Sequence, residues 1–224
     1  MATVSPPARP QDDHGQDFAR ARRTMIESQL RPTGIYDVVV LEAMASIRRE
    51  DFLPESLRSI AYMDRQIPLG GGRAMNSPLA QASLLQQARP LPGDKALLIG
   101  GGTGYMAAML ASQVGSLDVV EPDERLARIC PVSAGAWHSG PLDAGWAANA
   151  PYTLVVIDGA VEHVPDLLVD QLVTDGRIVL GTVERGVTRL ATGVRVADRI
   201  AIQPLAEIGM AVLPSFAREQ GWSF

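Results

Sequence analysis

The 224-residue sequence has one cysteine, three histidines and no long hydrophobic run. Because Cys130 has no second cysteine to pair with, an internal disulfide is excluded, and the single thiol is typical of a reducing cytoplasm. Cys130 and the three scattered histidines do not have the spacing of metal ligands. We therefore expect no metal site.

Two further kinds of partner are disfavoured by charge and hydropathy. The net charge is −5 and no basic cluster stands out, which argues against binding to a nucleic-acid backbone. The longest apolar runs, near 97–99 and 154–157, are far too short to cross a membrane. Residues 1–16 contain no apolar core of a signal peptide. We expect a cytoplasmic protein that binds neither nucleic acid nor membrane, of an oligomeric state that the sequence does not indicate.

What the sequence does contain is enough apolar residues, 46%, to form a full core in one domain. Residues 1–16 are rich in Pro, Asp and Gln and are predicted to be a mobile tail. Residues 17–90 are predicted to form a helical extension that makes one compact unit with the domain at 91–224. Its predicted parts are helices at 17–30, 38–46 and 78–88, a short helix after Pro54 and a loop over 60–75.

Strands and helices alternate from residue 95 onward, which predicts a parallel sheet with right-handed crossovers. The alternating residues at 188–208 favour an antiparallel pair at the sheet edge. The fold class is therefore α/β, a Rossmann-like doubly wound sheet that is mostly parallel. The predicted strands are 95–99, 116–120, 152–157 and 177–182, and the predicted helices are 104–113 and 164–173.

A glycine turn at Gly100, Gly102 and Gly104 follows the first of these strands. Glycine allows the backbone to approach a ligand closely, and the amides of the following helix point at that ligand. Glu121 ends the next strand, where a carboxylate can accept hydrogen bonds from ribose hydroxyls. Tyr105 replaces the third glycine of the dinucleotide pattern, and the absence of a following lysine excludes a P-loop. The pattern favours an adenosine cofactor with Tyr105 packed beneath it; a tight turn without a ligand is the alternative.

Segments on both sides of the glycine turn resemble the protein-L-isoaspartate O-methyltransferase family, over about residues 24–182. The G-x-G-x-G spacing itself is similar to the first motif of class I methyltransferases, which bind S-adenosylmethionine. This resemblance implies methyl transfer from S-adenosylmethionine to the free carboxylate of isoaspartyl residues in damaged proteins or peptides. The segments that carry it are 25–30, 34–37, 40–44, 51–54, 61–64, 67–70, 120–123, 150–152, 164–172 and 175–179.

The sequence departs from the family at three positions near the implied site. The acidic residue that normally precedes the first glycine by two positions is Leu98, and the acid near the adenine corresponds to Pro141. The adenine contact is therefore expected from the backbone or from apolar packing, for example by Leu142. The family's serine beside the methyl-transfer site falls on Asn76, whose amide can donate to a carboxylate. Ser77 is the alternative donor, although Ser before Pro also fits a helix cap.

Two further residues are candidates for the substrate side of the site. Asp158 follows a predicted strand, and the carboxyl ends of parallel strands line the ligand crevice, although Asp-Gly is also a common turn. Arg73 is close to Asn76 in the sequence and can meet a substrate carboxylate in bidentate fashion; solvation at the surface is the alternative.

Three interpretations of function follow from these residues. The first is an isoaspartyl methyltransferase. The second is a catalytically silent relative that uses the fold to bind a partner or sense a metabolite, because the serine and two acids are replaced. The third is a methyltransferase with a different carboxylate substrate.

Overall fold

A computed structural model of the chain describes residues 13–217. Its centre is a seven-stranded sheet in the order β5-β4-β3-β6-β7-β8-β9, accompanied by a separate β1-β2 hairpin. The strands are β1 (Ile67–Gly70), β2 (Arg73–Met75), β3 (Lys95–Ile99), β4 (Ser116–Val120), β5 (Ala136–His138), β6 (Tyr152–Val161), β7 (Leu172–Glu184), β8 (Val187–Val196) and β9 (Arg199–Glu207). The helices are α1 (Asp13–Met25), α2 (Val38–Ser46), α3 (Pro78–Ala88), α4 (Tyr105–Ala111), α5 (Glu124–Ala127) and α6 (Asp166–Val169).

The central strands are parallel, and their register brings the carboxyl ends of β3 and β4 level with Ile157 of β6, a strand that continues to Val161 instead of ending at 157 as predicted. Ile99 of β3 pairs with Val120 of β4 and with Ile157 of β6. The next residue in each case is one of the predicted site residues: Gly100, Glu121 and Asp158. The predicted parallel sheet is confirmed, and it places these three residues along one edge.

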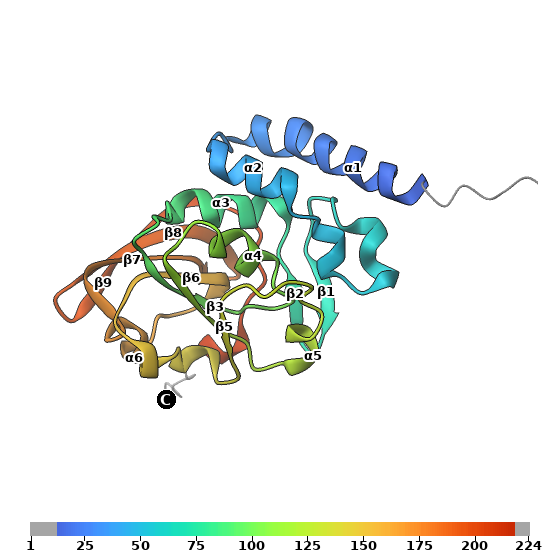
Figure 1. The fold of residues 1–224 in the computed structure, drawn as a ribbon. Helices are drawn as coiled ribbons and strands as arrows, with labels where there is room; N and C mark the ends of the chain where they lie inside the picture. Colours follow the sequence, from blue (N-terminus) through green and yellow to red (C-terminus); the bar gives the residue numbers. More distant parts are fainter. Residues whose placement is uncertain (1–12, 218–224) are drawn as a thin grey trace, which may run out of the picture.

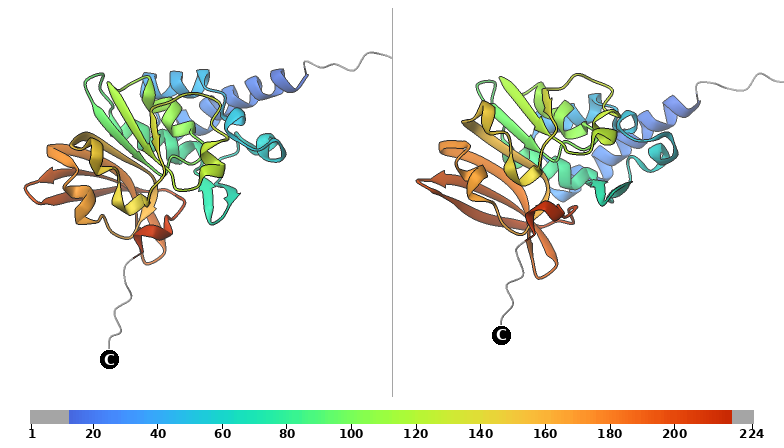
Figure 2. Two further views of the ribbon diagram at one scale, coloured as in Figure 1. Left: turned by 60° about the horizontal axis from the view of Figure 1, so that its bottom comes forward. Right: turned by 90° about the horizontal axis from the view of Figure 1, so that it is seen from below.

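The other end of the sheet is antiparallel. β7 runs parallel to β6 but antiparallel to β8, and β8 pairs antiparallel with β9. The predicted antiparallel pair at the edge is confirmed as β8 and β9. These strands lie at the opposite end of the molecule from α1 (Figure 2).

Helices cover both faces of the sheet, and α1 to α4 lie together on one of them (Figure 1). Leu98 and Val156 point into this side, where one core cluster also contains Met25 and Leu84. Alternate residues of the same strands, including Leu97, point to the other face and pack with α6. The helical extension and the sheet therefore share one continuous core.

Local capping explains where two helices begin. The Asp37 carboxylate accepts hydrogen bonds from the amides of Val39 and Val40 and begins α2, which has the predicted bounds. Ser77 caps α3, and Pro78 occupies its first turn. The helix expected from Asp17 begins earlier, at Asp13, and ends in a short π-helical turn at Ile26–Leu30.

Two local predictions are wrong. The helix expected over 164–173 is reduced to the four residues of α6, because Gln171 has tertiary partners. Its carbonyl accepts from the Tyr152 amide at 2.7 Å and its side chain donates to the Ala144 carbonyl at 2.8 Å. The loop expected over 60–75 contains the β1-β2 hairpin, whose turn at 70–72 is made by three glycines with φ of +82°, +59° and +74°.

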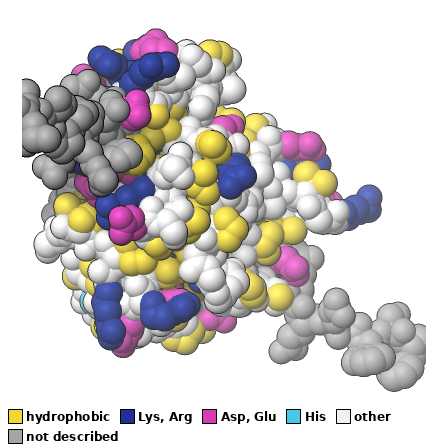
Figure 3. Space-filling model, turned by 90° about the vertical axis from the view of Figure 1, so that its right-hand side faces the viewer, with side chains coloured by type: hydrophobic (Ala, Val, Ile, Leu, Met, Phe, Trp, Pro, Cys, Tyr) yellow, Lys and Arg dark blue, Asp and Glu magenta, His cyan; other side chains and the backbone are white. Residues whose placement is uncertain are grey.

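The predicted division into a tail at 1–16, an extension at 17–90 and a domain at 91–224 stays a prediction, and most of the tail falls outside the described residues. Within residues 13–217, no helix is both long and apolar enough to cross a membrane. The same residues contain no group of three His, Cys, Asp or Glu side chains placed to hold a metal ion. Acidic and basic side chains are interspersed on the face shown in Figure 3.

Candidate functional site

Glu121 lies at the end of β4 with its carboxylate directed at the glycine turn. The side chain is fully buried. One oxygen, Oε2, accepts from the Gly102 amide at 2.7 Å and from Arg73 Nη2 at 2.6 Å. The other, Oε1, accepts from the Asp123 amide at 3.1 Å. The carboxylate therefore faces the glycine turn, with Arg73 as an additional partner that the sequence did not suggest.

The glycine turn has a shape that side chains would disturb. Gly102 has a φ of +54°, and its amide points at Glu121. Gly104 has a φ of +94°, and a Cβ atom there would lie 2.3 Å from the Cys130 sulfur. Gly102 thus gives its amide to the Glu121 carboxylate, while the absence of a side chain at Gly104 leaves room for Cys130. This arrangement is the one expected for a ligand-binding turn of an α/β sheet.

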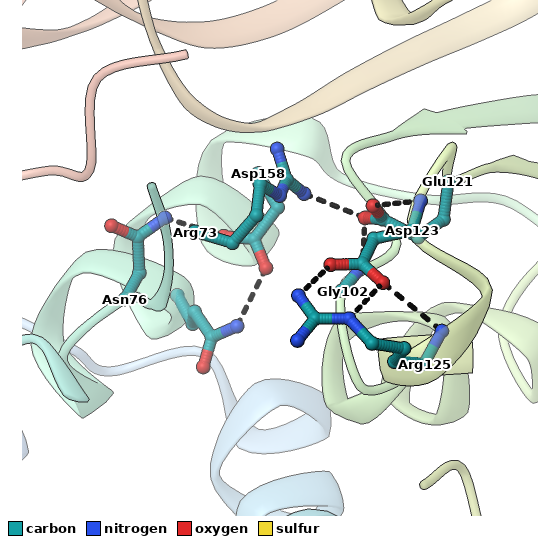
Figure 4. Close-up of polar contacts among 8 residues, drawn as sticks. Arg73, Asn76, Gly102, Glu121, Asp123, Arg125 and Asp158 are labelled. Carbon is teal, nitrogen blue, oxygen red and sulfur yellow. Dashed lines mark hydrogen bonds and ion pairs between the residues drawn. The ribbon is translucent and has the colours of Figure 1, made fainter. Parts of the chain in front are cut away.

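Asp158 is held beside this turn by two amide side chains. Asn76 Nδ2 donates to Oδ1 at 2.7 Å, and Gln81 Nε2 donates to Oδ2 at 2.6 Å (Figure 4). Burial raises the pKa of Asp158, although these hydrogen bonds and the charges of Arg49 and Arg73 act against the increase. Asp158 is therefore part of a built polar cluster and not simply an exposed Asp-Gly turn.

The Asn76 side chain is buried and hydrogen-bonded at both its nitrogen and its oxygen. Its Nδ2 donates to Asp158, and its amide oxygen accepts from the Ala211 amide at 2.7 Å. Ser77 Oγ accepts from the Ala80 amide at 3.3 Å, so this hydroxyl serves as the cap of α3. Asn76 thus orients Asp158 and Ser77 caps α3, and a catalytic role for either side chain stays a prediction.

Arg49 and Gln81 complete the cluster, and the sequence analysis missed both. Arg49 is fully buried and donates to the Gln81 side chain, to the Asn76 carbonyl and, at 2.8 Å, to the Ala61 carbonyl. In the sequence Arg49 lies in a charged run that looks solvated. Gln81 is one of four polar residues among the eleven of α3, so the sequence did not single it out.

The model of the family Protein-L-isoaspartate(D-aspartate) O-methyltransferase (PCMT) matches residues 20–209. Protein-L-isoaspartate O-methyltransferase 1 from Rhodopseudomonas palustris (strain HaA2) is 30% identical over 223 residues, 96% of this chain and 90% of the relative. Protein-L-isoaspartate O-methyltransferase 2 from Anaeromyxobacter sp. (strain Fw109-5) is 39% identical, over 70% of this chain and 68% of the relative.

The chain belongs to the protein-L-isoaspartate O-methyltransferase family.

The fold agrees with this membership. A crystal structure from Plasmodium falciparum, assigned as a protein-L-isoaspartate O-methyltransferase in complex with S-adenosyl-L-homocysteine, has a TM-score of 0.72. It is 16% identical and covers 88% of this chain and 98% of its own, so the likeness concerns the fold. A second protein-L-isoaspartate O-methyltransferase structure has a TM-score of 0.71 and 19% identity, covering 87% of this chain and 65% of its own.

Two residues of this family member that the sequence analysis assigned to the cofactor are buried in the core. Tyr105 is 1% exposed, and its ring lies 5.4 Å from that of Phe52 and beneath the Arg49 guanidinium. Burial raises the pKa of Tyr105 to about 12. Leu142 is 2% exposed and belongs to the core cluster on the opposite face of the sheet. Leu142 therefore offers little surface to an adenine ring, and contact of either residue with a cofactor stays a prediction.

The region between Glu121 and β6, whose one α-helix, α5, has four residues, is closed by polar and aromatic contacts. Asp118 accepts from Asn149 at 2.8 Å and from the Tyr152 hydroxyl at 3.1 Å, and it lies 2.6 Å from His138 Nε2. The His138 ring stacks on Trp146 with a centroid distance of 4.0 Å. These contacts hold the short strand β5 against β4 and account for the aromatic residues there.

Proposed function

We propose that the protein transfers a methyl group from S-adenosylmethionine to the carboxylate of isoaspartyl residues in proteins or peptides. The observation that carries this proposal is the level register of β3, β4 and β6 in a member of this family. It brings the Gly100 turn, the Glu121 carboxylate and the Asp158 cluster to one edge of the sheet. Free Cys130 supports a reducing compartment, and the cytoplasm is the compartment that we propose.

The residues present fit the sugar end of the cofactor. The glycine turn leaves the backbone of Gly102 uncovered, since a Cβ atom there would meet nothing nearer than the Gly100 carbonyl oxygen at 3.9 Å. The buried carboxylate of Glu121 supplies acceptors for ribose hydroxyls. At the amino-acid end of the cofactor, Leu98 stands where the family usually has an acidic residue. Leu98 is buried and apolar, so the backbone of the glycine turn is the remaining partner for that end.

The proposed reaction needs alignment more than acid–base chemistry. When bound, S-adenosylmethionine supplies a methyl group that bonds to a carboxylate oxygen as the carbon–sulfur bond breaks and its electron pair stays on sulfur. The acceptor carboxylate is already ionised at neutral pH, so no base is required. We assign Arg73 to binding the acceptor carboxylate. We assign the hydrogen-bonded cluster of Asn76, Gln81 and Asp158 to forming the rigid surface beside that carboxylate. Proximity and orientation are then the main source of rate.

The test uses two synthetic peptides that differ only in one aspartyl linkage, normal or isoaspartyl. With S-adenosylmethionine present, mass spectrometry should show methyl ester on the isoaspartyl peptide and none on its normal counterpart. Equal methylation of both peptides would indicate a different carboxylate substrate. Cofactor binding without methylation of either peptide would support the catalytically silent relative, which the family comparisons do not favour.

A further inference from the structure

Arg73 connects the glycine turn and Glu121 with the cluster around Asp158. It is the first residue of β2, and its side chain lies between Asp158 and Glu121 (Figure 4). Its Nη2 lies 2.6 Å from Glu121 Oε2, in a pair whose side chains are 11% and 0% exposed. The same Nη2 would lie 3.5 Å from a Cβ atom on Gly100, so the guanidinium covers the start of the glycine turn.

This ion pair occupies a place that a ribose needs. A carboxylate has about four acceptor positions. Three donors already use those of Glu121: the amides of Gly102 and Asp123, and Arg73. The two amides belong to the backbone and are fixed by the fold, whereas Arg73 is a long side chain on a hairpin. A nucleoside whose two ribose hydroxyls both bind Glu121 must therefore displace Arg73.

The displaced guanidinium has donors to offer elsewhere. Arg73 Nε and Nη1 are buried and have no hydrogen-bond partner among residues 13–217. Neither of them donates to Asp158, whose two oxygens accept from the amide side chains of Asn76 and Gln81. Unsatisfied buried donors of this kind favour an incoming carboxylate, which can accept in bidentate fashion.

We propose that Arg73 exchanges partners during the reaction cycle. Without nucleoside it neutralises Glu121 and closes the ribose site; with nucleoside bound it is released to hold the acceptor carboxylate. Cofactor binding therefore precedes and strengthens acceptor binding. This inference rests on the proposed function and assigns Arg73 as the residue that couples the two substrates.

The first test is calorimetric titration with S-adenosylhomocysteine, adenosine and 2′,3′-dideoxyadenosine. Arg73→Met removes the guanidinium and keeps the apolar stem. It should tighten S-adenosylhomocysteine and adenosine binding by about tenfold or more, because Glu121 no longer has to give up a partner. The dideoxy compound, which lacks the competing hydroxyls, should show no such gain. Arg31→Met, which breaks an exposed pair with Glu27, is the matched control and should leave all three affinities unchanged.

The second test measures binding of the isoaspartyl peptide with and without saturating S-adenosylhomocysteine. In the wild type the nucleoside should strengthen peptide binding by about fivefold or more, and in Arg73→Met this coupling should disappear. Thermal melts show whether Arg73→Met folds, and Arg73→Gln provides a second, polar variant for the same titrations.

The outcomes separate this inference from the proposed function. If the wild type binds S-adenosylhomocysteine and Arg73→Met binds it equally or more weakly, the exchange is refuted and the proposed function stands. An equal gain for the dideoxy compound also refutes it, since the competition would not then concern the ribose hydroxyls. If none of the folded proteins binds S-adenosylhomocysteine at millimolar concentration, the proposed function itself fails.

Discussion

At the scale of single residues, the site is organised by two carboxylates with different partners. Glu121 accepts from two backbone amides and Arg73, whereas Asp158 accepts from the side chains of Asn76 and Gln81. The first faces the glycine turn and suits a sugar. The Asp158 carboxylate accepts from the Asn76 side chain, whose amide oxygen in turn accepts from the Ala211 amide. A chemical role can therefore be tested separately for each.

Replacement of Glu121 by Gln should weaken S-adenosylhomocysteine binding by at least about tenfold. The ribose hydroxyls would lose a charged acceptor, and a hydrogen bond to a charged group contributes about 1.5–3 kcal/mol. Isothermal calorimetry measures the change, with Glu27→Gln at an exposed pair as the control. An unchanged Kd in Glu121→Gln would show that the nucleoside lies elsewhere.

The raised pKa of Asp158 predicts how the stability of the fold depends on pH. Its pKa is raised in the folded state by burial, so the folded protein holds this proton more tightly than the unfolded chain does. The contribution of Asp158 to stability is therefore most favourable at acid pH and decreases as pH rises from its ordinary pKa of 3.8 through the raised value. The melting temperature of the wild type minus that of Asp158→Asn should fall over that interval and then level off. A difference that rises with pH would contradict the assignment.

At the scale of elements, the β1-β2 hairpin positions Arg73 beside Glu121. Its turn requires three consecutive residues with positive φ, and only glycine adopts such conformations without strain. The hairpin was expected to be a loop, because its strands have only four and three residues and little alternation. Pairing of Ile67 with Met75 and burial of both residues stabilise it in the tertiary structure.

Gly72→Ala should therefore lower the free energy of unfolding by about 1–2 kcal/mol, since φ at this position is +74°. Denaturant unfolding measures the change. Gly93→Ala is the matched control, because a Cβ atom meets nothing within 4 Å at either position and Gly93 has no positive φ. Equal effects of the two substitutions would show that the backbone conformation of the turn is not the cause.

At the scale of the whole molecule, stability should be graded across the sheet. β3 is buried on both faces and paired on both sides, whereas β9 is an edge strand whose residues are exposed, apart from partly buried Ile200. Hydrogen exchange followed by mass spectrometry should show β3 amides exchanging at least about 100-fold more slowly than those of β9. Similar rates in the two strands would mean that the sheet opens as one unit.

The order of elements was predictable because the signals for it are local. Buried apolar runs predicted β3, β4 and β6, a Ser-Pro pair predicted the start of α3, and glycines predicted the turn after β3. The shortened α6 was not predictable, because it is ended by tertiary contacts of Gln171. Arg49 was missed for the same kind of reason: a buried arginine and a solvated one look alike in a charged run.

The sequence by itself determined the α/β order, the glycine turn and the position of Glu121, since each depends on residues a few positions apart. Only the tertiary structure decided which groups those residues meet. Arg73 reaches Glu121 across 48 positions and Asn76 reaches Asp158 across 82, and both contacts depend on the register of strands and on the placement of a hairpin. No local pattern encodes such pairings, because they arise from how the whole chain packs.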